Sequence, residues 1–285
     1  RSDAPVRSQS RLANLRDMLA LVMTDEVANT TVRCADVTAI TDDEGYFTIA
    51  LPRDERSDWT EEDVYVEGRS EPVACPFFIP RADAQFLVIS DIDDTMMETG
   101  AYSLISNLYT SFTGNSQTRR IFPDAVDLMN GLSNEGLNPV FYVSSSPWNM
   151  HAFLGAIFAR ANLVRGPMFL RDLGFSDTKF ITDGHGNHKG GSIDHILNAN
   201  PDLPAILLGD TGQHDARIYH AATNRHPGRI VAIGLRTPGP GVDAEDKADL
   251  AALEQSGVPT YAAPDFTEMG KMLRSSLPEY FAKTF

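Results

Sequence analysis

The amino-acid sequence predicts an α/β protein, in which a Rossmann-like parallel sheet flanked by helices follows a small β-sandwich. From residue 86 onward, short continuous apolar runs alternate with segments whose apolar residues recur at helical spacing. This order is expected of parallel strands joined by helices. Before residue 86, short β-prone runs alternate with polar turns, which is typical of a small antiparallel domain. A chain of 285 residues is long enough for two domains, which we expect at 1–84 and 85–285.

The composition excludes several classes of function. With 24 Lys and Arg against 39 Asp and Glu, the formal net charge is −15, so we expect no general nucleic-acid binding. We also expect no transmembrane segment, because the longest strongly apolar stretch, residues 152–159, is too short to span a bilayer. Cys34 and Cys75 could make one bridge, but two reduced thiols in a cytoplasmic protein are the more common arrangement.

The first domain is predicted to contain one helix and four or five short strands. Apolar residues at helical spacing predict an amphipathic helix over residues 9–23. Short runs rich in β-branched and aromatic residues, separated by polar turns, predict strands at 31–37, 46–50, 63–67 and 73–79. Residues 41–45 are expected to form a turn, and residues 80–83 a linker.

The second domain is predicted to alternate strands and helices. Continuous apolar runs predict strands buried on both faces at 86–90, 139–143, 205–208 and 230–235, with a weaker candidate at 258–262. Helical spacing predicts helices at 123–133, 149–161, 190–199, 214–224, 244–256 and 265–276. In open parallel sheets, ligands bind at the carboxyl ends of the strands. The residues that follow each strand are therefore the candidate functional residues.

The first strand of this sheet runs into a dense group of carboxylates that includes Asp91 and Asp93. Two such charges in one space favour a bound cation, and Mg²⁺ prefers hard oxygen ligands. A carboxylate at a strand end can also attack phosphorus and form an aspartyl phosphate, and a second one can act as general acid and base. A solvated acidic turn is the alternative, but the position directly after a buried strand makes it less favoured.

Later segments supply compatible groups in order along the chain. Ser144 follows the second strand, where a hydroxyl can hold a phosphate oxygen. Lys189 could balance the aspartates and a phosphoryl group. Asp210 ends the fourth strand and Asp215 lies a helical turn further on, so both can reach an ion near Asp91.

Together these motifs resemble the haloacid dehalogenase superfamily and, within it, the catalytic domain of the actin-patch-protein type of phosphatidate phosphatase. The resemblance covers roughly residues 86–236 and rests on residues 89–95, 142–148, 170–172, 188–189 and 208–215. Residues 42–47 also resemble the turn of transthyretin-like sandwiches, more weakly. The fold expected from the resemblance is therefore a haloacid dehalogenase-like domain after a transthyretin-like one.

The resemblance implies a Mg²⁺-dependent phosphatase with a role for each motif residue. Asp91 would attack phosphorus, and Asp93 would protonate the leaving oxygen and later activate water. Thr95 would support the loop, and Ser144 and Lys189 would hold the phosphoryl oxygens. The implied Mg²⁺ ligands are Asp91, the backbone carbonyl of Asp93, Asp210 and Asp215.

The implied substrate is phosphatidate, hydrolysed to diacylglycerol at a membrane surface by a cytoplasmic, peripheral protein. Ser145, Trp148 and Arg171 are the candidate substrate-binding residues. Apolar stretches at 101–112 and 147–154 could line an entry for acyl chains, although ordinary helical packing is the favoured explanation for them. The charge of −15 opposes docking on anionic lipid. A soluble phosphomonoester or a nucleic-acid end remains an alternative substrate, and a binding or scaffold protein built on the sandwich remains an alternative function.

Overall fold

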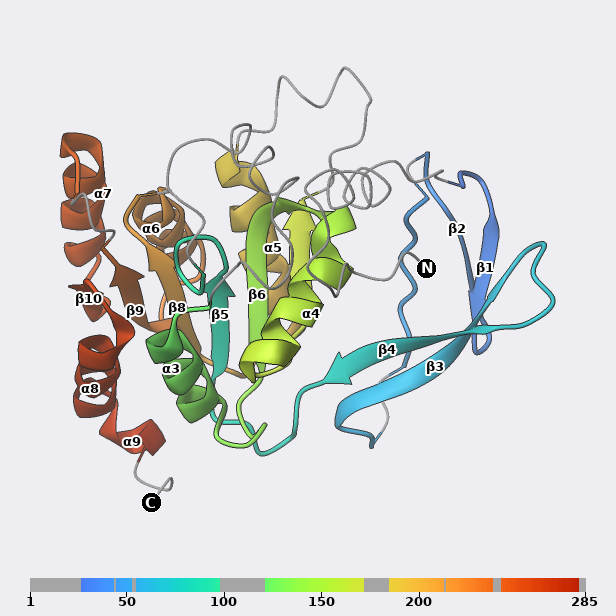
Figure 1. Cartoon of the computed structure of the whole chain (residues 1–285), viewed down its shortest axis with the longest axis horizontal. Coiled ribbons are helices and arrows are strands. Elements are labelled where there is room, and N and C mark those ends of the chain that lie inside the picture. Colours follow the sequence, from blue (N-terminus) through green and yellow to red (C-terminus); the bar gives the residue numbers. More distant parts are fainter. Residues whose placement is uncertain are drawn as a thin grey trace, which may run out of the picture. The chain divides into compact units, whose positions relative to one another are not determined.

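The computed structural model describes residues 27–43, 45–52, 55–97, 121–171, 185–212, 214–237 and 242–281. The chain divides into two compact units, of which one spans Val22–Ala82 and the other contains everything from Asp83 onward (Figure 1). The predicted helix at 9–23 and the apolar segment at 101–112 lie outside the described residues. Among the described helices, none has the length and apolar character needed to cross a membrane.

The smaller unit contains a four-stranded antiparallel sheet in the order β2-β1-β3-β4 (Figure 1). Its core is formed by Val32, Cys34 and Val64, and both cysteines are free thiols. The described residues of this unit form no second sheet, which a sandwich requires. The bounds of the strands are β1 Thr31–Cys34, β2 Val37–Ile40, β3 Asp58–Val66 and β4 Val73–Ile79.

Two strand predictions for this unit are corrected by the structure. The run at 31–37 is broken by a tight turn at Ala35, whose φ of 48° lies in the left-handed region, so it forms a hairpin of β1 and β2. The prediction of a strand at 46–50 is wrong, because this segment pairs with no strand. Ile49 and Leu51 instead pack on the core without strand pairing. Their apolar character reflects burial, which periodicity alone does not distinguish from a strand.

The larger unit contains a six-stranded parallel sheet in the order β10-β9-β8-β5-β6-β7. Central strands β5 and β8 are buried along their whole length, which explains their continuous apolar sequences. The predicted Rossmann-like sheet flanked by helices is confirmed. The strands are β5 Leu87–Asp91, β6 Val140–Pro147, β7 Met168–Arg171, β8 Ala205–Asp210, β9 Ile230–Arg236 and β10 Thr260–Ala263.

Helices pack on this sheet in two groups (Figure 1). Helices α3, α4 and α8 share one core, to which they contribute Met129, Phe153 and Met269. Helices α5, α6 and α7 contact one another in that order. Their bounds are α3 Pro123–Ser133, α4 His151–Ala161, α5 His185–Ala199, α6 Asp215–Arg225, α7 Ala244–Glu254 and α8 Phe266–Ser276, with a 3-10 turn η1 Trp148–Met150 and the short α9 Pro278–Phe281.

Residues 97 and 121, on either side of segment 98–120, pair with each other close to the carboxyl end of β5. Met97 forms isolated bridges with Asp93 and with Ile121, and the backbone N–H of Phe122 donates to the carbonyl of Met96 at 2.9 Å. The residues on either side of segment 98–120 are therefore direct neighbours beside the carboxyl end of the central strand.

Candidate active site

The predicted functional side chains come from three adjacent parallel strands and the helices that follow them. Strand β5 lies between β6 and β8, with Asp91 opposite Val143 of β6 and Ser90 opposite Leu208 of β8. The carboxyl ends of these strands therefore meet at one edge of the sheet. Asp91, Ser144 and Asp210 all lie at this edge, where parallel α/β sheets bind ligands.

A buried lysine connects two of the carboxylates. Lys189 Nζ lies 2.7 Å from Asp91 Oδ1 and donates to Asp215 Oδ1 at 2.7 Å. All three side chains are at most 4% exposed. Lys189 is positioned by α5, which begins at His185 and not at residue 190 as predicted. A lysine on a helix, packed by Asp91 and Asp215, is held more rigidly than one on a loop.

Asp210 lies beside this pair with one carboxylate oxygen that has no hydrogen-bond partner. Its Oδ2 accepts a hydrogen bond from the N–H of Gly212 at 2.7 Å, while the buried Oδ1 accepts none from the described residues. Oxygens of Asp91, Asp210 and Asp215 lie within 4.8 Å of one another. A buried acceptor without a donor is costly, and a hard cation would satisfy it.

The electrostatics of the cluster fit a divalent ion. Burial first, and then the charges of Asp215 and Asp93, raise the pKa of Asp91 to about 8 against the attraction of Lys189. Burial, and then the charges of Asp215 and Asp91, raise the pKa of Asp210 to about 9. Burial would lower the pKa of Lys189, but the two carboxylates raise it above its usual range. Three carboxylates around one ammonium leave excess negative charge, which protons or a divalent cation can relieve.

Asp93 is held by two serine hydroxyls from β6. Ser144 Oγ donates to Asp93 Oδ2 at 2.8 Å, and Ser146 Oγ donates to the same oxygen at 3.0 Å. The N–H of Ser146 also donates to Ser144 Oγ at 2.9 Å. Ser144 was predicted to hold a phosphoryl oxygen, and the structure places its hydroxyl on the carboxylate predicted to act as acid and base. Sequence reasoning missed Ser146, although the alternation of side chains along a strand puts it on the face of Ser144.

The loop that carries Asp91 and Asp93 is held by an arginine at the carboxyl end of β9. Thr95 Oγ1 donates to Asp91 Oδ2 at 3.1 Å, and the carbonyl of Thr95 accepts from Arg236 Nε at 3.1 Å. Arg236 also pairs with Asp124 at 2.6 Å and lies between the rings of Phe122 and Phe266. The sequence gives no signal for this role, because a single arginine after a strand is ordinary.

The predicted substrate-binding residues lie around the same strand ends. Ser145 is half-buried on β6, between the two serines that contact Asp93. Trp148 is 41% exposed and stacks on His151, with ring centroids 5.1 Å apart. Arg171 ends β7 and pairs with Pro147 of β6. All three are thus carried by the carboxyl-terminal ends of β6 and β7 or by the turn that follows.

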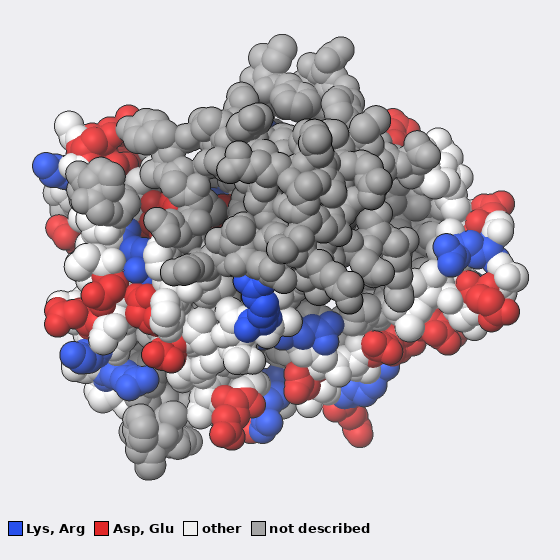
Figure 2. All heavy atoms as spheres, in the orientation of Figure 1, with Lys and Arg blue, Asp and Glu red and all other residues white. Residues whose placement is uncertain are grey.

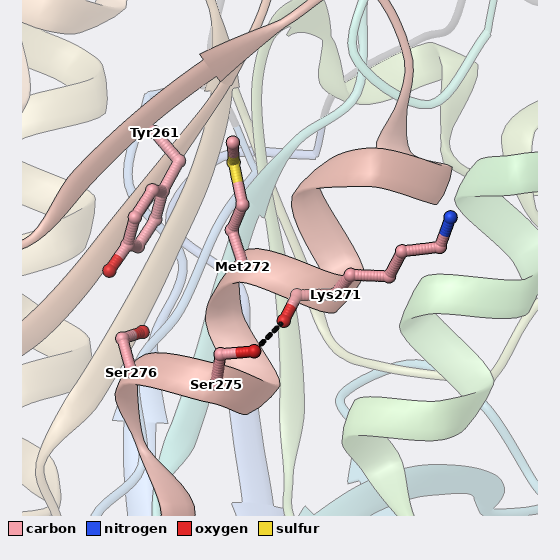
Figure 3. A pocket seen from close by; sticks show the side chains of 5 residues that line it. All are labelled: Tyr261, Lys271, Met272, Ser275 and Ser276. Atoms are coloured by element: carbon pink, nitrogen blue, oxygen red, sulfur yellow. Dashed lines mark hydrogen bonds between the residues drawn. The ribbon is translucent and has the colours of Figure 1, made fainter.

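Two other features lie outside this cluster. His214, Glu245 and Asp249 bring possible ligand atoms together, but Arg217 already forms ion pairs with both carboxylates. A shallow pocket lies between β10 and α8 (Figure 3). It contains none of the predicted catalytic residues and is lined by Tyr261, Lys271, Met272, Ser275 and Ser276.

Comparison with known proteins identifies relatives of the larger unit. The family model described as "Phosphatidate phosphatase APP1, catalytic domain" matches residues 86–237. Phosphatidate phosphatase APP1 of Saccharomyces cerevisiae is 30% identical over 177 residues, which covers 61% of this chain and 30% of the yeast protein. Uncharacterized protein C29B5.04c of Schizosaccharomyces pombe is 26% identical over 220 residues, which covers 71% of this chain and 34% of that protein.

The chain thus spans about a third of the length of these curated relatives. Among solved structures, the HAD domain of effector protein Lem4 from Legionella pneumophila (inactive mutant) matches with a TM-score of 0.36 and 12% identity. That match covers 61% of this chain and 97% of the other.

Proposed function

The chain belongs to the family of the phosphatidate phosphatase APP1 catalytic domain, and on this premise we propose that it is a Mg²⁺-dependent phosphatase. Its substrate is a phosphomonoester, and we propose phosphatidate, hydrolysed to diacylglycerol. We further propose that it is a cytoplasmic protein that acts at membrane surfaces. We also propose that it consists of two domains, residues 1–84 and residues 85–285.

One observation carries this proposal. Asp91 contacts Lys189 in a buried position, and beside it a second carboxylate, that of Asp93, accepts hydrogen bonds from serine hydroxyls. Asp91 is fixed by Lys189 on one oxygen and by Thr95 on the other. Asp93 lies two residues further on at the same edge and is half-buried. A fixed carboxylate beside a more accessible one suits a nucleophile and an acid–base group.

The chemistry needs two steps. In the first, a carboxylate oxygen of Asp91 forms a bond to phosphorus as the ester P–O bond breaks, and the proton of Asp93 passes to the departing alkoxide oxygen. In the second, Asp93 takes a proton from water while the water oxygen bonds to phosphorus, and the Asp91–phosphorus bond breaks to release inorganic phosphate. The ammonium of Lys189 attracts the phosphoryl oxygens and keeps Asp91 in place.

Asp91, Asp210 and Asp215 would hold the ion, together with the backbone carbonyl of Asp93 and phosphoryl oxygens. The unpartnered Oδ1 of Asp210 and the excess charge of the cluster support this set. When bound, Mg²⁺ supplies positive charge that neutralises the phosphoryl group.

The lipid substrate is supported by the family and by the exposed ring of Trp148, which follows β6 directly. The face of the molecule seen in Figure 2 carries acidic and basic side chains interspersed, and the residues drawn in colour there form no continuous basic surface. The net charge of −15 gives no general attraction to an anionic lipid, so its capture would depend on the site itself. A soluble phosphomonoester is the second candidate, since such a substrate needs no docking surface.

The experiment measures phosphate release from phosphatidate in mixed micelles and from glycerol 3-phosphate, a sugar phosphate and a nucleotide. Each substrate is tested with Mg²⁺ and with a chelator. We expect Mg²⁺-dependent release with phosphatidate preferred. Activity on soluble esters alone would reject the lipid substrate, and undiminished activity in the chelator would reject the metal.

The nucleophile is tested with Asp91→Asn, which we expect to lower kcat at least about a thousandfold. Asp202→Asn is the matched control, because Asp202 is exposed in the turn before β8, at the opposite end of that strand. Acid quenching of the wild type during turnover should trap a phosphoryl group that hydroxylamine removes. Full activity of Asp91→Asn would contradict the assignment, whereas Asp202→Asn should behave as the wild type.

A further inference from the structure

The hydroxyls of Ser144 and Ser146 both donate a hydrogen bond to the same oxygen of Asp93. Ser144 is fully buried and donates to Asp93 Oδ2. A serine hydroxyl has a single proton, so Ser144 cannot donate to Asp93 and to a phosphoryl oxygen at the same time. If Ser144 turns to the substrate, as its phosphoryl-holding role implied by the family resemblance demands, Asp93 loses that hydrogen bond during the proton transfer.

Ser146 supplies a hydrogen bond that does not depend on this exchange. Its hydroxyl reaches Asp93 Oδ2 at 3.0 Å, and its N–H occupies one acceptor site of Ser144 Oγ at 2.9 Å. The N–H thereby restricts the directions in which Ser144 can point its proton. Strand β6 presents both hydroxyls to the same oxygen of Asp93.

We propose that Ser146 is a positioning residue for the phosphatase reaction: it holds the carboxyl group of Asp93 in place while Ser144 transfers its hydrogen bond from Asp93 to the phosphoryl group. Ser146 acts through Asp93 and touches neither phosphorus nor the ion. This inference rests on the proposed function and adds a residue to it. Ser146 therefore affects only the two proton transfers of Asp93, which are the delivery of a proton to the leaving oxygen and the removal of a proton from water.

The test exploits the leaving group. An alkyl phosphate such as glycerol 3-phosphate releases a strongly basic alkoxide that needs a proton, whereas p-nitrophenyl phosphate releases a weakly basic phenolate that departs without one. The parameter kcat/KM reports the first step, in which the alcohol leaves. Both esters present the same phosphoryl group, so a residue that bound the phosphoryl would affect both alike.

For Ser146→Ala in the full chain with Mg²⁺, we expect kcat/KM to fall at least about tenfold on glycerol 3-phosphate and less than about threefold on p-nitrophenyl phosphate. KM should change little for either ester. Ser146→Thr keeps a hydroxyl and should restore most of the lost rate. Ser276→Ala is the matched control, since that serine is half-buried and its hydroxyl donates to the carbonyl of Leu273 on α8.

The outcomes separate the two proposals. Equal losses on both esters, or no rescue by threonine, would overturn the role of Ser146 while leaving the phosphatase intact. A wild-type chain that hydrolyses neither ester nor phosphatidate would overturn the proposed function itself. Should Ser146→Ala fail to fold, Ser146→Cys keeps a single γ-atom on the side chain and replaces the hydroxyl by a weak donor. This variant must show the same difference between esters for the inference to stand.

Discussion

Arg236 offers the sharpest test of how the catalytic loop is held. Its guanidinium is 7% exposed and contacts Asp124 at 2.6 Å, the Thr95 carbonyl at 3.1 Å and the Pro264 carbonyl at 3.3 Å. Arg236→Met removes the cation and leaves the carboxylate of Asp124, which is 17% exposed, with one hydrogen bond from the described residues, donated by the N–H of Phe266 at 2.7 Å. Breaking one side of a buried ion pair costs about 3–5 kcal/mol.

For a domain of this size, each kcal/mol shifts the melting temperature by about 2–4 °C, so thermal denaturation should show a decrease of about 6–20 °C. Arg217→Met is the control. Arg217 forms two ion pairs but is 54% exposed. Its replacement should therefore lower the free energy of unfolding by no more than about 1 kcal/mol. In the double variant Arg236→Met/Asp124→Asn the isolated charge is gone, and the loss should be smaller than in Arg236→Met. Equal melting temperatures for the two single arginine variants would refute the reasoning.

Two further perturbations address the carboxylate cluster. Gly209→Ala would place a Cβ 2.5 Å from Asp215 Oδ2 and 2.8 Å from the Tyr219 hydroxyl, so we expect a loss of about 1–3 kcal/mol in thermal melts, with reduced activity; an unchanged protein would contradict the packing. The raised pKa values of Asp91 and Asp210, about 8 and about 9, mean that the folded state binds more protons than the unfolded state above about pH 4. The metal-free protein should therefore lose stability as the pH rises to 9, and Mg²⁺ should raise the melting temperature more at pH 9 than at pH 6. The opposite trend in scanning fluorimetry would count against a metal site.

The sheet was predictable because burial on both faces leaves a plain sequence signal. The two central strands are apolar from Leu87 to Ile89 and from Ala205 to Leu208, before each ends in a carboxylate. Helix 123–133 was predicted with its observed bounds. Strand β7 was missed because it has four residues and lies at the sheet edge, with one residue fully buried. Four residues are too few to show the alternation of apolar and polar side chains that would predict a strand.

The start of α5 was misplaced for a different reason. Gly190 and Gly191 favour a loop by propensity, yet both lie inside the helix. A Cβ at Gly190 would lie 3.3 Å from the guanidinium of Arg225, so contact with α6 favours a small residue there over a good helix former. The sequence predicted which carboxylates would gather, but hydrogen-bond partners such as Ser146 and Arg236 depend on distances that only the fold sets.

The pairing of Met97 with Ile121 has a consequence for how relatives of this chain can diversify. Because residues 98–120 depart from and rejoin the sheet at neighbouring positions, changing their length leaves the strands on either side undisturbed. Doubling such a segment costs only about 0.6 kcal/mol in closure entropy. This junction could therefore accept insertions of different lengths without any change in the carboxylate cluster.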